Sequence, residues 1–101
     1  MQMKNNMKKI AILGLGNISY ELCNFLIQKD FEVSGTTNNF ERKNELQELG
    51  VKVFTRNEIT ACIMNSNKII ITVPPDSNGC PIIRDYFKQI LHSQIKWIGY
   101  L

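Results

Sequence analysis

The chain has 101 residues, which is enough for one small domain and too few for two. Its 44% hydrophobic content and net charge of +3 are typical of a globular protein rather than a disordered one. The basic residues are scattered, which argues against a nucleic-acid surface. No apolar run approaches the roughly 20 residues of a membrane span, and none has the form of a signal-peptide core, so we expect a cytoplasmic protein without a membrane partner.

The first half of the chain alternates short apolar runs with helical patterns. Residues 1–7 are polar with three methionines, so we expect a flexible leader before a single domain over residues 8–101. Residues 8–13 form an apolar run that ends at a glycine, and they predict a buried strand. Helical spacing then predicts a helix whose inner face carries Ile18, Leu22, Phe25 and Leu26. Alternation over residues 31–35 predicts a second strand, and residues 36–39 a turn.

Capping signals delimit the next elements. Asn39 is a good N-cap for a helix over residues 40–49, and Gly50 a good C-terminal stop. Residues 51–54 predict a third strand. Thr55 or Asn57 could then cap a brief helix that carries Ile59 and Ile63.

The last third of the chain repeats this alternation. Residues 68–73 are apolar and predict a fourth strand that Pro74 and Pro75 end. Pro81 suits the first position of a helix, whose predicted inner face carries Ile83, Phe87, Ile90 and Leu91. Residues 95–101 read as a fifth strand. The order βαβαβαβαβ predicts an α/β fold with helices on both faces of a parallel sheet, and right-handed crossovers give the strand order 3-2-1-4-5.

The turn after the first strand has the pattern of a phosphate-binding loop in a Rossmann domain. Gly14 permits a tight exit from the strand, and Gly16 lets the backbone approach a pyrophosphate. The helix that starts near Asn17 and Ile18 would offer free N–H groups to the phosphates. Ser19 stands where a glycine or alanine is usual. A glycine turn in an α/β protein that binds nothing is the alternative.

The end of the second strand bears on the choice of cofactor. NAD sites usually place an acidic residue there to hold the ribose hydroxyls, and residues 35–39 contain none. Thr36, Thr37 and Asn38 carry hydrogen-bonding groups, and Arg42 lies one helical turn further on, which favours the 2′-phosphate of NADP over NAD. Arg42 could equally belong to a solvated helix face. Pro74 follows the fourth strand and would line the same groove.

The three cysteines do not predict a metal site. Cys23, Cys62 and Cys80 are far apart and form no Cys-x-x-Cys pair, and the one histidine, His92, has no cysteine near it in the sequence. We expect reduced thiols.

Four segments resemble a known family: KIAILGLG at residues 9–16, VSGTT at 33–37, IITVPP at 70–75 and KWIGYL at 96–101. Together they make residues 8–101 similar to the N-terminal half of extended short-chain dehydrogenase/reductases, above all to atypical NAD(P)-dependent epimerase-like members. The resemblance implies a dinucleotide cofactor and a truncated domain, incomplete on its C-terminal side.

The catalytic residues of that family have no counterpart here. The family uses a Ser or Thr with Tyr-x-x-x-Lys, but Tyr20 is followed four residues on by Asn24, and Tyr86 by Ile90. Tyr100 is followed only by Leu101. We therefore predict no catalytic residue in the chain and no activity by the chain alone. A complementing C-terminal chain, or self-association through the fifth strand, is the expected partner.

Three functions stay open at this point. The chain could be the cofactor-binding piece of an epimerase or reductase, a stand-alone nucleotide-sensing module, or a gene remnant without present function.

Overall fold

The computed structural model describes residues 8–16, 19–74 and 76–101. The leader expected at residues 1–7 lies outside them. In chain order the elements are β1 (Lys9–Leu13), α1 (Ser19–Gln28), β2 (Glu32–Thr36), α2 (Phe40–Leu49), β3 (Lys52–Phe54), the 3-10 turn η2 (Arg56–Glu58), α3 (Ile59–Met64), β4 (Lys68–Ile71), α4 (Pro81–Leu91) and β5 (Trp97–Tyr100).

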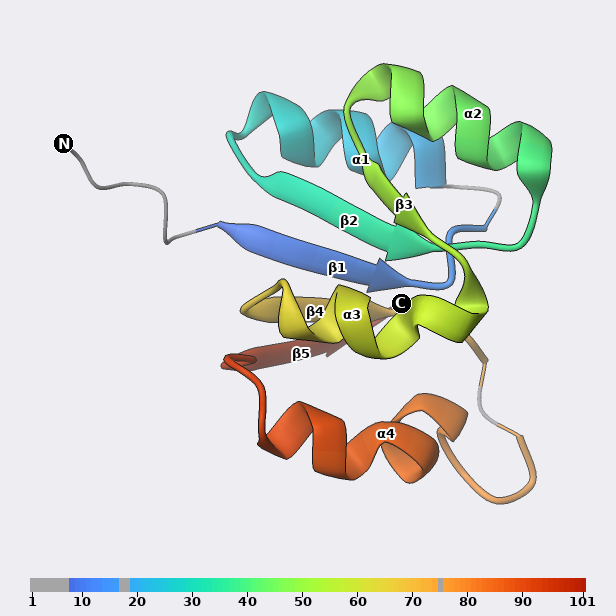
Figure 1. Cartoon of the computed structure of the whole chain (residues 1–101), viewed down its shortest axis with the longest axis vertical. Helices are drawn as coiled ribbons and strands as arrows, with labels where there is room; N and C mark the ends of the chain where they lie inside the picture. The colour runs from blue at the N-terminus through green and yellow to red at the C-terminus, as the bar shows by residue number, and fades with distance from the viewer. Residues whose placement is uncertain (1–7, 17–18, 75) are drawn as a thin grey trace, which may run out of the picture.

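The strands form one five-stranded sheet in the order β3-β2-β1-β4-β5, and every pairing is parallel. Figure 1 shows the strands side by side, with α1 beside α2. This is the predicted Rossmann-like fold with the predicted strand order. Because β1 lies between β2 and β4, the chain reverses its direction of winding there, and the carboxyl ends of β1, β2 and β4 meet at one edge of the sheet.

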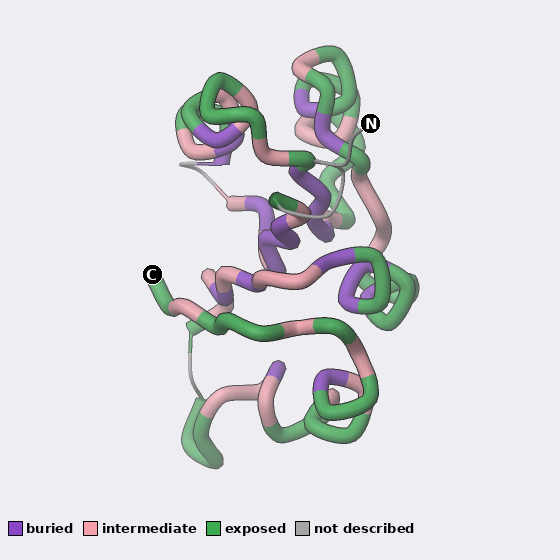
Figure 2. Tube along the Cα trace, turned by 90° about the vertical axis from the view of Figure 1, so that its left-hand side faces the viewer, coloured by how far each residue is buried: buried purple, intermediate pink, exposed green. Residues whose placement is uncertain are grey.

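Two hydrophobic cores lie on opposite faces of the sheet. Alternate residues of the central strands point to opposite faces, so Ile10 and Ile12 belong to the core under α1 and α2, whereas Ala11 and Leu13 belong to the core under α3 and α4. In Figure 2 the buried parts of the tube gather along the middle of the sheet, and the segment that leads to the C-terminus is largely exposed. The predicted helices on both faces are confirmed.

The strand bounds differ from the prediction by one or two residues, and two of these differences concern the carboxyl ends of β2 and β4. Thr36, expected in a turn, is the last residue of β2 and is buried, because Leu13 pairs with it in the sheet. In contrast, β4 ends at Ile71 rather than at residue 73. Thr72 leaves the sheet because its hydroxyl donates hydrogen bonds to the carbonyl oxygens of Leu13 and Gly14.

Two helix faces were wrongly predicted in part. In α1 the buried residues are Ser19, Cys23 and Leu26. Phe25 is exposed instead, and the Lys29 ammonium lies 5.6 Å from the centroid of its ring. Ile18 lies outside the described residues.

In α4 the buried residues are Ile82 and Ile90, while Phe87 and Leu91 are exposed. The backbone of Tyr86 is not helical, with φ −123° and ψ 20°. The helix still buries a stripe at helical spacing across this kink, made of Ile82, Ile83, Tyr86 and Ile90, which lies beside the predicted face.

The predicted caps are confirmed at both ends of α2. The Asn39 side chain accepts a hydrogen bond from the Arg42 N–H at 2.9 Å, and Gly50 ends the helix with φ 110°. Thr55 rather than Asn57 is the N-cap of the turn before α3, and Pro81 begins α4.

The three thiols are free. Cys23 and Cys62 are buried, and burial raises the pKa of each thiol to about 11. At neutral pH both are therefore protonated and behave as small apolar side chains. Across the residues described, no helix is long and apolar enough to cross a membrane.

Candidate functional site

A groove of about 430 Å³ opens at the carboxyl ends of β1, β2 and β4. The arrowheads in Figure 1 mark these ends. Three loops contribute to it: the glycine loop after β1, the segment after β2 and the segment after β4. Its lining consists of Gly14, Leu15, Gly16, Thr36, Thr37, Asn38, Arg56, Thr72, Val73 and Pro74. Open parallel sheets bind their ligands at this position.

The two glycines of the loop have different roles. Gly14 has φ 113°, and a Cβ on it would lie 2.6 Å from Thr72 Oγ1 and 2.9 Å from Val73 Cγ2. The fold itself therefore requires a glycine at position 14. Among the described residues, a Cβ on Gly16 would meet only the Gly14 carbonyl oxygen, at 4.0 Å, and so would have room. The packing of the protein does not require Gly16, but a ligand that approaches the loop closely would.

Two threonines hold the glycine loop in place. Thr36 Oγ1 accepts a hydrogen bond from Gly14 N at 3.2 Å, and the Thr36 carbonyl oxygen accepts one from Leu15 N at 2.8 Å. On the other side, Thr72 N donates to the Leu13 carbonyl oxygen at 3.3 Å. The backbone of the loop is thus bonded to the end of β2 on one side and to the segment after β4 on the other.

The segment after β2 is tied to the segment after β3. Thr37 N donates to the Phe54 carbonyl oxygen at 3.0 Å, and Asn38 Oδ1 accepts from Arg56 N at 3.1 Å. These bonds bring Arg56 to the rim of the groove, next to Thr37.

Arg42 reaches the glycine loop from α2. Its guanidinium Nη1 donates to the Leu15 carbonyl oxygen at 3.4 Å. Arg42 therefore lies against the loop rather than on a freely solvated face, although it is not part of the groove lining.

The structure brings most of the predicted site residues together. Gly14, Gly16, Thr36, Thr37, Asn38 and Pro74 all line the groove. Asn17 and Ile18 lie outside the described residues. The sequence analysis missed Arg56, although its position two residues beyond β3 was a usable signal, because the carboxyl end of β3 adjoins that of β2 in a parallel sheet.

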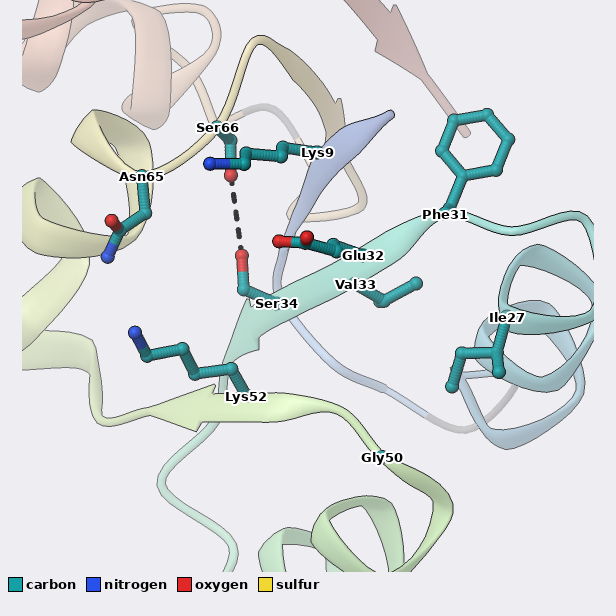
Figure 3. A pocket seen from close by; sticks show the side chains of 10 residues that line it. All are labelled: Lys9, Ile27, Phe31, Glu32, Val33, Ser34, Gly50, Lys52, Asn65 and Ser66. Carbon is teal, nitrogen blue, oxygen red and sulfur yellow. Dashed lines mark hydrogen bonds between the residues drawn. The ribbon is translucent and has the colours of Figure 1, made fainter. Parts of the chain in front are cut away.

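A second groove, of about 400 Å³, lies at the opposite edge of the sheet. Lys9, Glu32 and Lys52 are the first residues of β1, β2 and β3, and Figure 3 shows their side chains around it. Its buried hydroxyls, Ser34 and Ser66, are bonded to each other at 3.4 Å. The groove lies at the amino ends of the strands and has no glycine loop, so it lacks the features that hold a dinucleotide.

Comparison with known families identifies the domain. The family described as NADP oxidoreductase, coenzyme F420-dependent, matches residues 9–80. The chain belongs to this family. It is an NAD(P)-binding Rossmann domain of an oxidoreductase family, and the matched region includes all ten residues that line the first groove. No curated protein sequence matches the chain significantly.

Solved structures agree with this domain at the level of the fold. A conserved protein of unknown function from Silicibacter pomeroyi is 21% identical, with a TM-score of 0.76 over 93% of this chain and 34% of its own. An imine reductase from a Pseudomonas species is 22% identical, with a TM-score of 0.62 over 93% of this chain and 32% of its own. A D-isomer-specific 2-hydroxyacid dehydrogenase from Xanthobacter autotrophicus Py2, solved with NADPH, is 17% identical, with a TM-score of 0.65 over 91% and 36%.

The domain spans about a third of the length of these structures. They are dehydrogenases and reductases where their function is stated, which agrees with the family match. The narrower resemblance to epimerase-like short-chain dehydrogenase/reductases is not tested by these similarities and stays a prediction.

Proposed function

We propose that this domain binds NADP(H) in the groove at the carboxyl ends of its strands and serves as the cofactor-binding part of an oxidoreductase or epimerase-like protein. The observation that carries the proposal is Gly16, where an added Cβ would lie no closer than 4.0 Å to any of the described residues outside its chain neighbours. A glycine loop that leaves this room beside its backbone suits a pyrophosphate.

The charges around the groove favour NADP over NAD. None of its ten lining residues is acidic, and one of them, Arg56, is basic. Arg42 adds a second guanidinium at the glycine loop. A ribose 2′-phosphate can accept charge-assisted hydrogen bonds from these guanidinium groups. An unphosphorylated ribose would find no carboxylate in this groove to accept hydrogen bonds from its hydroxyls.

The proposed role is binding rather than turnover by this chain alone. A nicotinamide dinucleotide supplies the hydride chemistry, and the protein must then add a proton donor beside the substrate. The chain has no tyrosine followed four residues on by lysine. The cytoplasmic location stays a prediction as well.

Wild-type protein is expected to bind NADPH about tenfold more tightly than NADH, because each hydrogen bond to a charged group contributes about 1.5–3 kcal/mol. Arg42→Ala should remove part of this preference. Lys43→Ala is the matched control, since it removes the same charge from the next residue of α2. Fluorescence titration of wild type and of both variants, each with NADPH and with NADH, measures the three pairs of affinities.

Tighter binding of NADH would overturn the NADP assignment. If Arg42→Ala and Lys43→Ala change the two affinities equally, Arg42 has no specific role in cofactor binding, and the assignment of the groove as the binding site is unaffected.

The free edge of β5 supports a second proposal, that the domain joins another chain or a second copy of itself there. β5 pairs with β4 only, and four apolar side chains at this edge are 40–68% exposed: Trp97, Ile98, Tyr100 and Leu101. Exposed edges of this composition tend to pair with further strands.

Self-association should shift the emission of Trp97, the only tryptophan, to the blue as protein concentration rises. Ile98→Lys should abolish this shift, because a lysine on an edge strand opposes pairing. Gln94→Lys adds the same charge in the exposed loop before β5 and should leave the shift unchanged. Sedimentation of a monomer at every concentration, with constant Trp97 emission, would contradict self-association.

A further inference from the structure

Arg56 is brought to the groove by the fold, not by its neighbours in sequence. β3 ends at Phe54, and Arg56 begins the 3-10 turn that follows. Two hydrogen bonds fasten this turn to the end of β2: Thr37 N to the Phe54 carbonyl oxygen, and Arg56 N to Asn38 Oδ1. The second bond uses the backbone of Arg56, so the position of the residue does not depend on its side chain.

The guanidinium of Arg56 has no protein partner among the described residues, whether by ion pair or by hydrogen bond. The nearest acid in sequence, Glu58, is occupied elsewhere, since its Oε1 accepts from Thr55 N at 2.9 Å and from Thr55 Oγ1 at 3.2 Å. Arg84 shows the contrast, because its guanidinium pairs with Asp76 and Asp85 at 3.0 Å each. An uncompensated cation thus remains at the rim of the groove.

The place of this cation matches one part of the ligand. In Rossmann domains the adenosine ribose lies at the end of the second strand, here at Thr36 and Thr37, and Arg56 lines the groove beside them. A guanidinium presents several donors in one plane, which suits a phosphate better than a hydroxyl.

We propose that Arg56 is the specificity-determining residue for the 2′-phosphate of NADP(H), and that Asn38 positions it through the backbone bond. The inference rests on the proposed NADP(H) site but adds to it a residue from the segment that follows β3. It assigns the main discrimination between NADP and NAD to the segment after β3, with Arg42 in a secondary role at the glycine loop.

The test compares Arg56→Ala, Arg56→Lys and Lys52→Ala with wild type by titration with NADPH and NADH. Arg56→Ala should weaken NADPH binding about tenfold and change NADH binding less than about twofold, because only NADPH carries the extra phosphate. Arg56→Lys should recover part of the loss. Lys52→Ala removes the same charge from the other end of β3 and should change neither affinity. Because Arg56 is exposed and its backbone bond persists, all variants should keep their unfolding midpoints.

The outcomes separate this inference from the function on which it rests. If wild type prefers NADPH and Arg56→Ala keeps the same ratio, Arg56 is not the selecting residue and the proposed function stands. An equal loss for both cofactors would also overturn the inference, since Arg56 would then act on the shared part of the dinucleotide. Wild type that binds neither cofactor would overturn both.

Discussion

Gly16→Val is expected to weaken NADPH binding about a hundredfold, because a valine placed in the pyrophosphate path costs about 3 kcal/mol of steric overlap. The expected loss is confined to binding. Among the described residues, a Cβ on Gly16 would meet nothing closer than the Gly14 carbonyl oxygen at 4.0 Å, so the variant should fold normally. Titration with NADPH, together with the thermal unfolding midpoint of each protein, measures both properties.

Gly16→Ala provides the graded control and should give a smaller loss than valine. Equal NADPH affinity of wild type and Gly16→Val would contradict the placement of a dinucleotide at this loop. A valine variant that lost stability as well as binding would contradict the separate roles assigned to Gly14 and Gly16.

Gly35→Ala should lower the free energy of unfolding by about 2 kcal/mol, and the unfolding midpoint by about 10 °C for a domain of this size. Gly35 lies within β2, and a Cβ there would come within 2.8 Å of both the Ile12 carbonyl oxygen and the Leu15 side chain. A backbone oxygen in the central strand cannot move aside without disturbing the β1–β2 pairing. Urea denaturation followed by circular dichroism measures the change in free energy of unfolding.

Gly99→Ala is the matched control for this prediction. A Cβ on Gly99 would also overlap a neighbour, but the neighbour is the outer end of the Trp97 ring. The Trp97 side chain is half exposed and can swing away, so the expected loss is below about 1 kcal/mol. Similar losses in both variants would show that strand glycines matter here for a reason other than the contacts of an added Cβ.

The order of the elements could be predicted from sequence because each has a strong local signal. Asn39 and Gly50 delimit α2, and the apolar run before Gly14 predicts a buried strand. The right-handedness of the crossover connections then favours the strand order 3-2-1-4-5. The faces of α1 and α4 were harder, since Phe25 in α1 and Phe87 in α4 satisfy the helical period of the predicted faces and yet are exposed. The pattern of apolar residues in a short segment does not show which of these side chains lies outside the buried face.

The groove was predictable where a single loop builds it and less so where two segments meet. Gly14 and Gly16 stand in a recognisable pattern. Arg56 comes from a different segment, 18 residues after Asn38, and its backbone N–H donates a hydrogen bond to the Asn38 side chain. The strand order decides which loops are neighbours. Such contacts can therefore be predicted once the expected strand order is used to pair the loops that follow adjacent strands.

The hydrogen bonds that join the glycine loop to Thr36 and Thr72 have a thermodynamic consequence. They fix the backbone of residues 13–15 to the end of β2 on one side and to the segment after β4 on the other. A phosphate arriving there would not have to order this stretch of the loop, so that part of the entropic cost of association has already been met during folding. If the proposed site is right, affinity at this end of the dinucleotide depends on the stability of the sheet, and a mutation that loosens β2 or β4 should weaken binding without touching the ligand.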